Sequence, residues 1–398
     1  MNTSARRGTV LSAFSGAGGL DLGLERAGFD PVLCLEVDSG AQETLRLNRP
    51  EWTVPSDGDV ITAGTRWTIT DVGLTLGGLD LIAGGPPCQP FSKAAQWTSS
   101  GRAGLKDPRA RPLRGFVSLI EKFLPRAIFI ENVPGFVIGS TSALRSLQLQ
   151  IMAINKRAGT SYRIQWWIID AADYGVPQRR QRAILIAFRD GRSFQLPAPT
   201  HNGSHTRTWD ALHDHVEMDP PIPTGSWTEL LPSIPEGQNY QWLTARGGGI
   251  ELFGWRTRYW SFLLKLARDR PAWTLPASPG PNTGPFHWDN RPLSTRERLR
   301  LQSFPDDWTL ARSQREQWRM AGNATPPLLA EAVGRALACE LGLRVASEKM
   351  PTLTLERIAQ VPPPTPPIAV GVRFASQSGP KQAHPGTGLG PAPRSKLS

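Results

Sequence analysis

Cysteine is scarce in this chain. The 398 residues contain only three, Cys34, Cys88 and Cys339, an odd number at wide spacing. That pattern excludes a disulfide scaffold and a cysteine-rich zinc site, and no metal is expected. Three unpaired thiols fit a reducing compartment such as the cytoplasm.

Long apolar runs are absent as well. No stretch approaches the roughly 18 uninterrupted apolar residues of a membrane span, and no apolar signal region follows Arg6 and Arg7 near the N-terminus. We therefore expect a soluble, cytoplasmic protein.

Acidic residues are outnumbered. The chain has 45 Lys and Arg against 34 Asp and Glu, for a net charge of +11 and a pI near 10.1. Such an excess favours a polyanionic partner, because neutralised phosphates release counterions and dominate nucleic-acid affinity. Part of the excess lies in the tail beyond residue 343.

Strand-like and helix-like patterns alternate between residues 9 and 188, which predicts an α/β fold: a Rossmann-like, mostly parallel sheet covered by helices on both faces. The predicted strands are Thr9–Phe14, Pro31–Glu36, Leu79–Ala83, Ala127–Glu131, Arg163–Asp170 and Arg182–Phe188; the predicted helices are Leu20–Ala27, Gly115–Leu124, Ala143–Arg157, Ser294–Gln302 and Pro326–Leu341.

Composition divides the chain into four parts. Residues 1–189 form the predicted α/β domain. Residues 190–290 are rich in Pro, Gly, Trp and Arg, which predicts a small, loop-rich inserted domain. Helical patterning returns in 291–343, and residues 344–398 have so little apolar content that we expect a disordered, basic Pro/Gly-rich tail.

Cys88 follows a buried strand and the stiff sequence Gly84-Gly85-Pro86-Pro87. The prolines fix φ and the glycines allow close approach of the backbone to a ligand. Loops at the carboxyl ends of parallel strands are where open α/β sheets bind ligands. A reactive nucleophile is favoured over a cysteine packed as a small hydrophobe.

A glycine-rich turn follows the first predicted strand, and acidic residues end the next ones. Gly16-Ala17-Gly18-Gly19 lacks the third glycine of a dinucleotide fingerprint, because position 21 is Asp. Glu36 is placed to accept hydrogen bonds from ribose hydroxyls, Val37 to cover an adenine, and Asp59 to accept from an adenine amino group. Together they favour S-adenosylmethionine over a nicotinamide cofactor.

Two more groups of residues carry chemistry. Glu131 ends a buried strand, where desolvation disfavours an ionised carboxyl, so that it is suited to exchange a proton with a ring nitrogen. Alternation along a strand predicts that Arg180 and Arg182 share a face. Two adjacent guanidiniums there favour an anion or a polar base edge between them.

The chain resembles the DNA (cytosine-5) methyltransferases of the bacterial modification type, over residues 9 to about 341. The motifs occur in the order of the family: Phe-Ser-Gly-Ala-Gly-Gly at 14–19, Pro-Pro-Cys-Gln at 86–89, Glu-Asn-Val at 131–133, Gln-Arg-Arg-Gln-Arg at 178–182, Arg-Pro-Leu-Ser-Thr-Arg-Glu at 291–297, Leu-Gln-Ser-Phe-Pro at 301–305 and Gly-Asn-Ala-Thr-Pro-Pro at 322–327. Ser12-Ala13 and Thr325 depart from the usual family pattern.

The resemblance implies roles. Cys88 would add to carbon 6 of cytosine, Glu131 would engage ring nitrogen 3 and the exocyclic amine, Arg182 would contact the carbonyl oxygen, and Arg180 would lie near the nucleophile on the phosphate or cofactor side. The target base would be flipped out of the duplex. Cofactor contacts would come from Phe14, Gly16, Gly18, Gly19, Leu20, Glu36, Val37, Asp59, Val60 and Asn323.

The inserted domain would then recognise the target sequence in duplex DNA. Its arginines are candidates to read guanine edges, the glycine-rich loop at 246–249 is expected to approach DNA, and most of its tryptophans are expected to form its core. The expected assembly is a monomer. It would act in restriction–modification, with a cognate restriction endonuclease as a possible partner, or as an orphan methylase. A tRNA cytosine-5 methyltransferase and a non-catalytic DNA-binding regulator on the same fold remain alternatives.

Overall fold

A six-stranded sheet organises the chain in the computed structural model, which describes residues 6–87, 111–139, 142–256, 259–345 and 351–380. The strands are β1 (Gly8–Ala13), β2 (Phe29–Leu35), β3 (Leu81–Gly84), β4 (Ala127–Asn132), β5 (Gln165–Asp170) and β6 (Gln181–Phe188). The longer helices are α1 (Gly19–Ala27), α2 (Ser39–Asn48), α3 (Val60–Arg66), α4 (Arg111–Phe123), α5 (Leu144–Ala158), α7 (Thr295–Leu301), α8 (Gln314–Asn323) and α9 (Pro327–Glu340). Within these ranges, no helix combines the length and apolarity that a membrane crossing requires.

The strand order is β2-β1-β3-β4-β6-β5. Strands β1 to β4 are parallel, whereas β6 runs antiparallel to both of its neighbours. The chain leaves β1 toward β2 on one side and later returns to place β3 on the other, so the order reverses between β1 and β3. The loops after these two strands therefore flank the crevice in which such sheets bind ligands.

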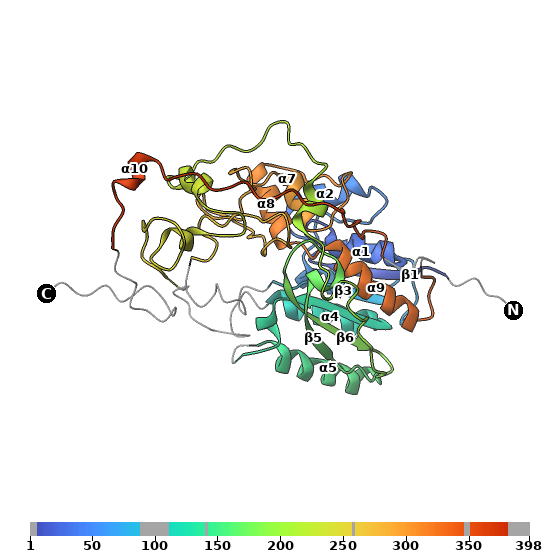
Figure 1. Ribbon diagram of the computed structural model, residues 1–398. Coiled ribbons are helices and arrows are strands. Elements are labelled where there is room, and N and C mark those ends of the chain that lie inside the picture. The colour runs from blue at the N-terminus through green and yellow to red at the C-terminus, as the bar shows by residue number, and fades with distance from the viewer. Residues whose placement is uncertain (1–5, 88–110, 140–141, 257–258, 346–350, 381–398) are drawn as a thin grey trace.

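Helices cover both faces of the sheet, as predicted, because apolar side chains of alternate strand residues point to opposite sides. On one face Leu11, Ile128 and Ile130 pack with apolar residues of α3, α4 and α5. On the other face Val10 and Phe129 pack with residues of α1 and α9. Figure 1 shows α5 and α9 on different sides of the strands.

Two glycines allow α9 to pack closely against α1. A Cβ on Gly23 would lie 2.3 Å from the Pro327 carbonyl oxygen, and one on Gly334 would lie 2.8 Å from the Ala27 Cβ. The returning segment 291–343 thus completes the layer over the first strand. We call the sheet with this segment the sheet domain.

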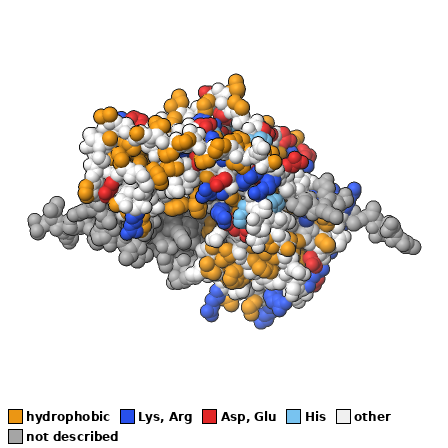
Figure 2. All heavy atoms as spheres, viewed as in Figure 1, with side chains coloured by type: hydrophobic (Ala, Val, Ile, Leu, Met, Phe, Trp, Pro, Cys, Tyr) orange, Lys and Arg blue, Asp and Glu red, His pale blue; other side chains and the backbone are white. Residues whose placement is uncertain are grey.

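Most of residues 190–290 lie in a second lobe with little regular structure (Figure 1), but Phe194, near the start of this range, packs in the apolar cluster of the sheet. The lobe contains α6 (Thr208–Leu212) and the 3-10 turns η6 (Thr228–Ser233) and η7 (Tyr240–Leu243). Two apolar clusters fill it, one around Leu231, Tyr240 and Phe286 and the other around Leu212 and Trp288, which also includes residues of the returning segment. Figure 2 shows basic and histidine side chains gathered near the middle of this face of the molecule.

The glycine-rich loop of the second lobe is shaped by a tryptophan. A Cβ on Gly248 would lie 2.3 Å from the ring of Trp242, and one on Gly247 would lie 2.2 Å from the Trp242 carbonyl oxygen. The adjacent Arg246 stacks on Trp255, with its guanidinium carbon 3.8 Å from the ring centroid. Packing against Trp242 therefore accounts for the glycines.

Residues 351–380 differ from the disorder predicted for residues 344–398. Residues 351–380, including the short α10 (Val372–Ala375), lie along the sheet domain and the second lobe. The reason is that a few side chains bury enough apolar surface to hold the segment, although its overall apolar content is low. Phe374, for example, is 5% exposed and belongs to an apolar cluster of the second lobe. We call this segment the C-terminal strap.

Candidate active site at the carboxyl edge of the sheet

The turn after β1 has an unusual backbone. Phe14 (φ 60°), Gly16 (φ 55°) and Gly18 (φ 80°) all lie in the left-handed region, which costs a residue with a Cβ more than glycine. The Phe14 amide donates to the Leu35 carbonyl at 2.8 Å, which fixes the turn to the end of β2. The Phe14 ring packs against Phe116, with centroids 6.1 Å apart.

The glycines of this turn serve different purposes. A Cβ on Gly18 would lie 2.7 Å from the Trp308 ring, and one on Gly19 would lie 2.1 Å from the Thr325 carbonyl oxygen. Both positions are thus filled by the returning segment. A Cβ on Gly16 would meet only the Phe14 carbonyl oxygen, at 3.8 Å, among the described atoms within 4 Å. Gly16 therefore leaves room for a ligand above the turn.

Glu36 connects the turn to the end of β2. One carboxylate oxygen accepts from the Gly16 amide at 2.8 Å, and the other accepts from the Val37 and Asp38 amides at 2.8 and 2.9 Å. The Val37 side chain is 66% exposed. The arrangement leaves an apolar side chain at the surface beside a preorganised carboxylate.

Asp59 and its neighbours complete this edge. A Cβ on Gly58 would lie 2.2 Å from the Glu36 carbonyl oxygen, so residues 36 and 58 are in contact. The Asp59 carboxylate caps α3 by accepting from the Ile61 amide at 2.9 Å. Val60 and Leu20 were both predicted to contact the cofactor. Their side chains are buried in the core rather than open to a ligand.

The loop after β3 meets the end of β4. A Cβ on Gly85 would lie 3.5 Å from a carboxylate oxygen of Glu131, and the Asn132 side-chain amide donates to the Pro86 carbonyl at 2.8 Å. These contacts bring the start of the Pro-Pro loop to Glu131. The predicted nucleophile, Cys88, lies just outside the described residues.

Glu131 and Arg182 form an ion pair because β6 is antiparallel. Reversal places the N-terminal end of β6 at the carboxyl end of β4, with Asn132 opposite Ala183. Arg182 Nε lies 2.7 Å from a carboxylate oxygen of Glu131, and both side chains are largely buried. Each charge thus offsets the desolvation cost of the other.

Arg180 has partners of its own. Its guanidinium is buried and donates to the carbonyl oxygens of Gly322 and Ala324, both at 2.9 Å. These carbonyls flank Asn323, an exposed residue at the end of α8. The sequence predicted an anion or a base edge between two adjacent guanidiniums. In the structure, Arg180 instead binds backbone carbonyls and Arg182 binds a carboxylate.

Two residues at this edge escaped prediction. Trp308 is buried, and its indole Nε1 donates to the Ala17 carbonyl at 3.0 Å. Asp21 is fully buried under the turn, where it accepts from the Ser15 hydroxyl at 3.1 Å and from the Cys34 thiol at 3.6 Å. Burial raises the Asp21 pKa to about 6 despite these hydrogen bonds. The position of Asp21 between the apolar residues Leu20 and Leu22 could have indicated from the sequence that this carboxyl is buried.

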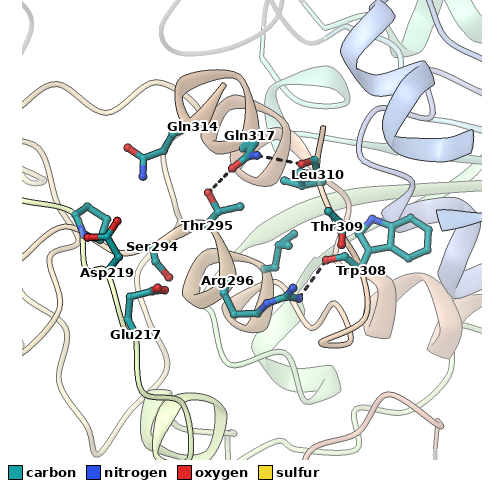
Figure 3. A pocket seen from close by; sticks show the side chains of 12 residues that line it. Glu217, Asp219, Ser294, Thr295, Arg296, Trp308, Thr309, Leu310, Gln314 and Gln317 are labelled. Carbon is teal, nitrogen blue, oxygen red and sulfur yellow. Dashed lines mark hydrogen bonds between the residues drawn. The ribbon is translucent and has the colours of Figure 1, made fainter. Parts of the chain in front are cut away.

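A separate, open cavity of about 310 Å³ lies between residues 217–221 of the second lobe and the returning segment. Figure 3 shows Glu217, Asp219 and Arg296 around it, with Gln317 bonded to Thr295 and to the Leu310 carbonyl. Trp308 also lines it, but none of the site residues predicted from the sequence does. We assign it no part in the chemistry.

Comparisons with known proteins agree with this geometry. The sequence model of the C-5 cytosine-specific DNA methylase family matches residues 8–339. The Type II methyltransferase M.SacI of Streptomyces achromogenes is 36% identical over 372 residues, covering 84% of this chain and 93% of the relative. M.PspPI of Psychrobacter sp. (strain TA137), also a Type II methyltransferase, is 32% identical, covering 84% and 79%.

A solved structure shares the fold. The S. pombe Dnmt2 methyltransferase aligns with 84% of this chain and 99% of its own, with a TM-score of 0.57 at 16% identity. The predicted Rossmann-like methyltransferase sheet is confirmed. The chain belongs to the C-5 cytosine-specific DNA methylase family and is a DNA (cytosine-5) methyltransferase.

Proposed function

We propose that the residues at the carboxyl edge of the sheet methylate carbon 5 of a cytosine that is flipped out of duplex DNA. The observation that carries the proposal is the buried Glu131–Arg182 pair beside the loop that leads to Cys88. Its carboxylate and guanidinium offer an acceptor and a donor to the polar edge of one base. A stacked base is out of reach of such a recessed pair.

Cys88 is the proposed nucleophile. Its thiolate forms a bond to carbon 6, which shifts electron density to carbon 5 and makes that carbon able to take a methyl group. Glu131 holds a proton at ring nitrogen 3 while this charge develops, and Arg182 donates to the carbonyl oxygen. Transfer of the carbon 5 proton to solvent water leaves an electron pair that forms the 5,6 double bond, and Cys88 departs as a thiolate, which restores the ring.

S-adenosylmethionine is the proposed cofactor, and when bound it supplies an electrophilic methyl group. The open space at Gly16, the exposed Val37 and the carboxyls of Glu36 and Asp59 fit an adenosyl group without a pyrophosphate. Gly18 and Gly19 support the turn from the other side. Arg180 fixes the backbone around Asn323, which keeps this exposed residue in place to contact the cofactor.

The second lobe is the proposed target-recognition domain. Tyr259, Trp260 and Trp273 are each at least 38% exposed, and Trp260 packs edge-on against Trp273 at 5.1 Å. The residue after Trp273, Thr274, donates to the Arg179 carbonyl at 2.7 Å. Trp273 is therefore close in the chain to a residue that contacts the segment carrying Arg180. Arg207, one of the arginines of the inserted domain that were predicted to read DNA, is instead held in an ion pair with Asp210.

A role in restriction–modification is the proposed biological setting, since the relatives are Type II methyltransferases. It implies a specific recognition sequence, a cognate restriction endonuclease and action on cytoplasmic DNA. A monomer suffices for this chemistry, because all the proposed groups come from one chain.

Transfer of labelled methyl groups to duplex DNA tests the proposed roles. We expect Cys88→Ala to abolish transfer and Glu131→Gln, which keeps an oxygen for Arg182, to reduce kcat by at least about 100-fold. Matched controls are Cys339→Ala, at an exposed position, and Glu121→Gln, whose half-buried side chain pairs with Arg157 away from the site. Intact transfer by Cys88→Ala would overturn the catalytic assignment.

The same assay with tRNA in place of DNA separates the two substrate classes. Transfer to tRNA alone would overturn the DNA proposal. Bisulfite sequencing of DNA from cells that express the protein would then identify the sequence context of the methylated cytosines.

A further inference from the structure

The C-terminal strap lies beyond residue 339, where the match to the family model ends. Figure 1 shows it running from the side of α9 across the molecule to α10 at the far end of the second lobe. It makes contacts at three separate places. Their order along the strap follows the path from the sheet domain to the outer part of the second lobe.

The first anchor is on the sheet domain. Glu331, a fully buried carboxylate of α9, accepts from the Thr352 amide at 2.7 Å, from the Thr352 hydroxyl at 2.9 Å and from the Leu353 amide at 3.2 Å. The Leu353 side chain packs against the apolar cluster beneath α9. A buried charge that binds two backbone amides fixes the start of the strap firmly.

The second anchor is at the start of the second lobe. Asp210, whose side chain is fully buried, accepts from the Ile358 amide at 3.0 Å, and its partner Arg207 donates to the Ile358 carbonyl. Arg357 donates to the Ser204 hydroxyl at 2.9 Å. The Asp210–Arg207 pair thus binds both backbone groups of one strap residue.

The third anchor completes a core. Phe374 is 5% exposed and packs against Trp227, with ring centroids 5.6 Å apart, in the apolar cluster of residues 230–286. The Ile368 amide donates to the Pro232 carbonyl at 3.0 Å. The outer part of the second lobe therefore lacks one of its aromatic core residues without the strap.

Between the second and third anchors the strap is stiff. Residues 361–367 contain five prolines, which favour an extended conformation of about 3.1 Å per residue. Fixed φ angles also reduce the entropy that is lost when the segment is ordered. Such a segment holds its two ends at a set separation.

We propose that the C-terminal strap is a positioning element that fixes the second lobe relative to the sheet domain, and so holds the lobe in the arrangement that binds duplex DNA. Glu331 holds its start, and Phe374 holds its end in the core of the lobe. This inference rests on the proposed role of the second lobe in DNA recognition. Release of the lobe lowers the fraction of molecules able to bind DNA, and apparent affinity falls in proportion to that fraction.

The test compares Phe374→Ala with Val372→Ala in the full chain, because Val372 lies on the same helix and is 87% exposed. If the lobe adopts its DNA-binding arrangement in about one-fifth of the Phe374→Ala molecules, the KM for DNA rises about fivefold. We expect kcat at saturating DNA and the affinity for S-adenosylmethionine to stay unchanged. Hydrogen exchange in residues 228–243 should become faster.

A second variant avoids dependence on the core residue. Replacement of the five prolines by serine keeps all three anchors but removes the stiffness, and we expect a smaller rise in KM for DNA. Equal behaviour of Phe374→Ala and Val372→Ala in exchange and in KM would overturn the proposal. Faster exchange without any change in KM would show that the strap anchors the lobe and would overturn the proposal that this anchoring sets the affinity for DNA.

Discussion

Replacement of Asp21 by asparagine should change how stability depends on pH. The carboxyl is fully buried under the turn after β1, and burial raises its pKa from 3.8 to about 6. Well below pH 3.8 the carboxyl is protonated in the folded and unfolded chains alike. As the pH rises from 3.8 towards 6, the unfolded chain ionises this group while the folded chain cannot, so stability that was present in acid is lost.

The size of the loss follows from the two pKa values. A folded pKa of about 6 against 3.8 unfolded corresponds to about 3 kcal/mol, complete above pH 7. An asparagine side chain does not ionise and loses nothing over this range. The free energy of unfolding of Asp21→Asn relative to wild type should therefore increase by about 2–3 kcal/mol between pH 4 and about pH 7.5.

Urea unfolding at a series of pH values measures this difference. Asp30→Asn is the matched control, because the Asp30 carboxyl is largely exposed and pairs with Arg7 at the surface. The increase of about 2–3 kcal/mol expected for Asp21→Asn should be absent from this control. A constant difference between Asp21→Asn and wild type over the whole pH series would show that Asp21 does not titrate in the folded protein as its burial implies.

Two further predictions concern the contact between the turn and the returning segment. Gly19→Ala should lower the free energy of unfolding by about 1–3 kcal/mol in urea titrations, because its Cβ would overlap the Thr325 carbonyl; Gly64→Ala, whose Cβ would lie 3.8 Å from Ser118, should be neutral or stabilising. Trp308→Phe removes the bond to the Ala17 carbonyl and should cost about 1 kcal/mol or more. It should also weaken S-adenosylmethionine binding in calorimetry, whereas Trp273→Phe, at an exposed position, should leave that affinity unchanged.

Sequence patterns predicted the sheet well because most of its strands contain a short, continuous apolar run. The predicted Thr9–Phe14 became β1, Gly8–Ala13, and the predicted Arg182–Phe188 became β6, Gln181–Phe188. The direction of β6 was beyond reach, because an apolar run has the same pattern in either direction. Helix α8, Gln314–Asn323, was missed because its polar sequence buries little of its surface.

The sequence predicted which strand ends form the site, but it did not predict how the residues at those ends pair with one another. Glu131 and Arg182 were both singled out, but their pairing depends on the reversal of β6. The partners of Arg180 lie more than 140 residues away in the chain. Pairings at that separation are set by how the returning segment packs, which no local pattern of residues encodes.

The C-terminal strap shows how low apolar content can predict disorder for a segment that is ordered. Low apolar content predicts disorder because a segment must bury enough surface to offset its loss of entropy. Prolines reduce that loss before any contact forms, so that Leu353, Ile358 and Phe374 at three separated anchors are enough. A proline-rich tail with sparse apolar residues is therefore compatible with an ordered strap wherever buried carboxylates such as Glu331 and Asp210 are placed to bind its amides.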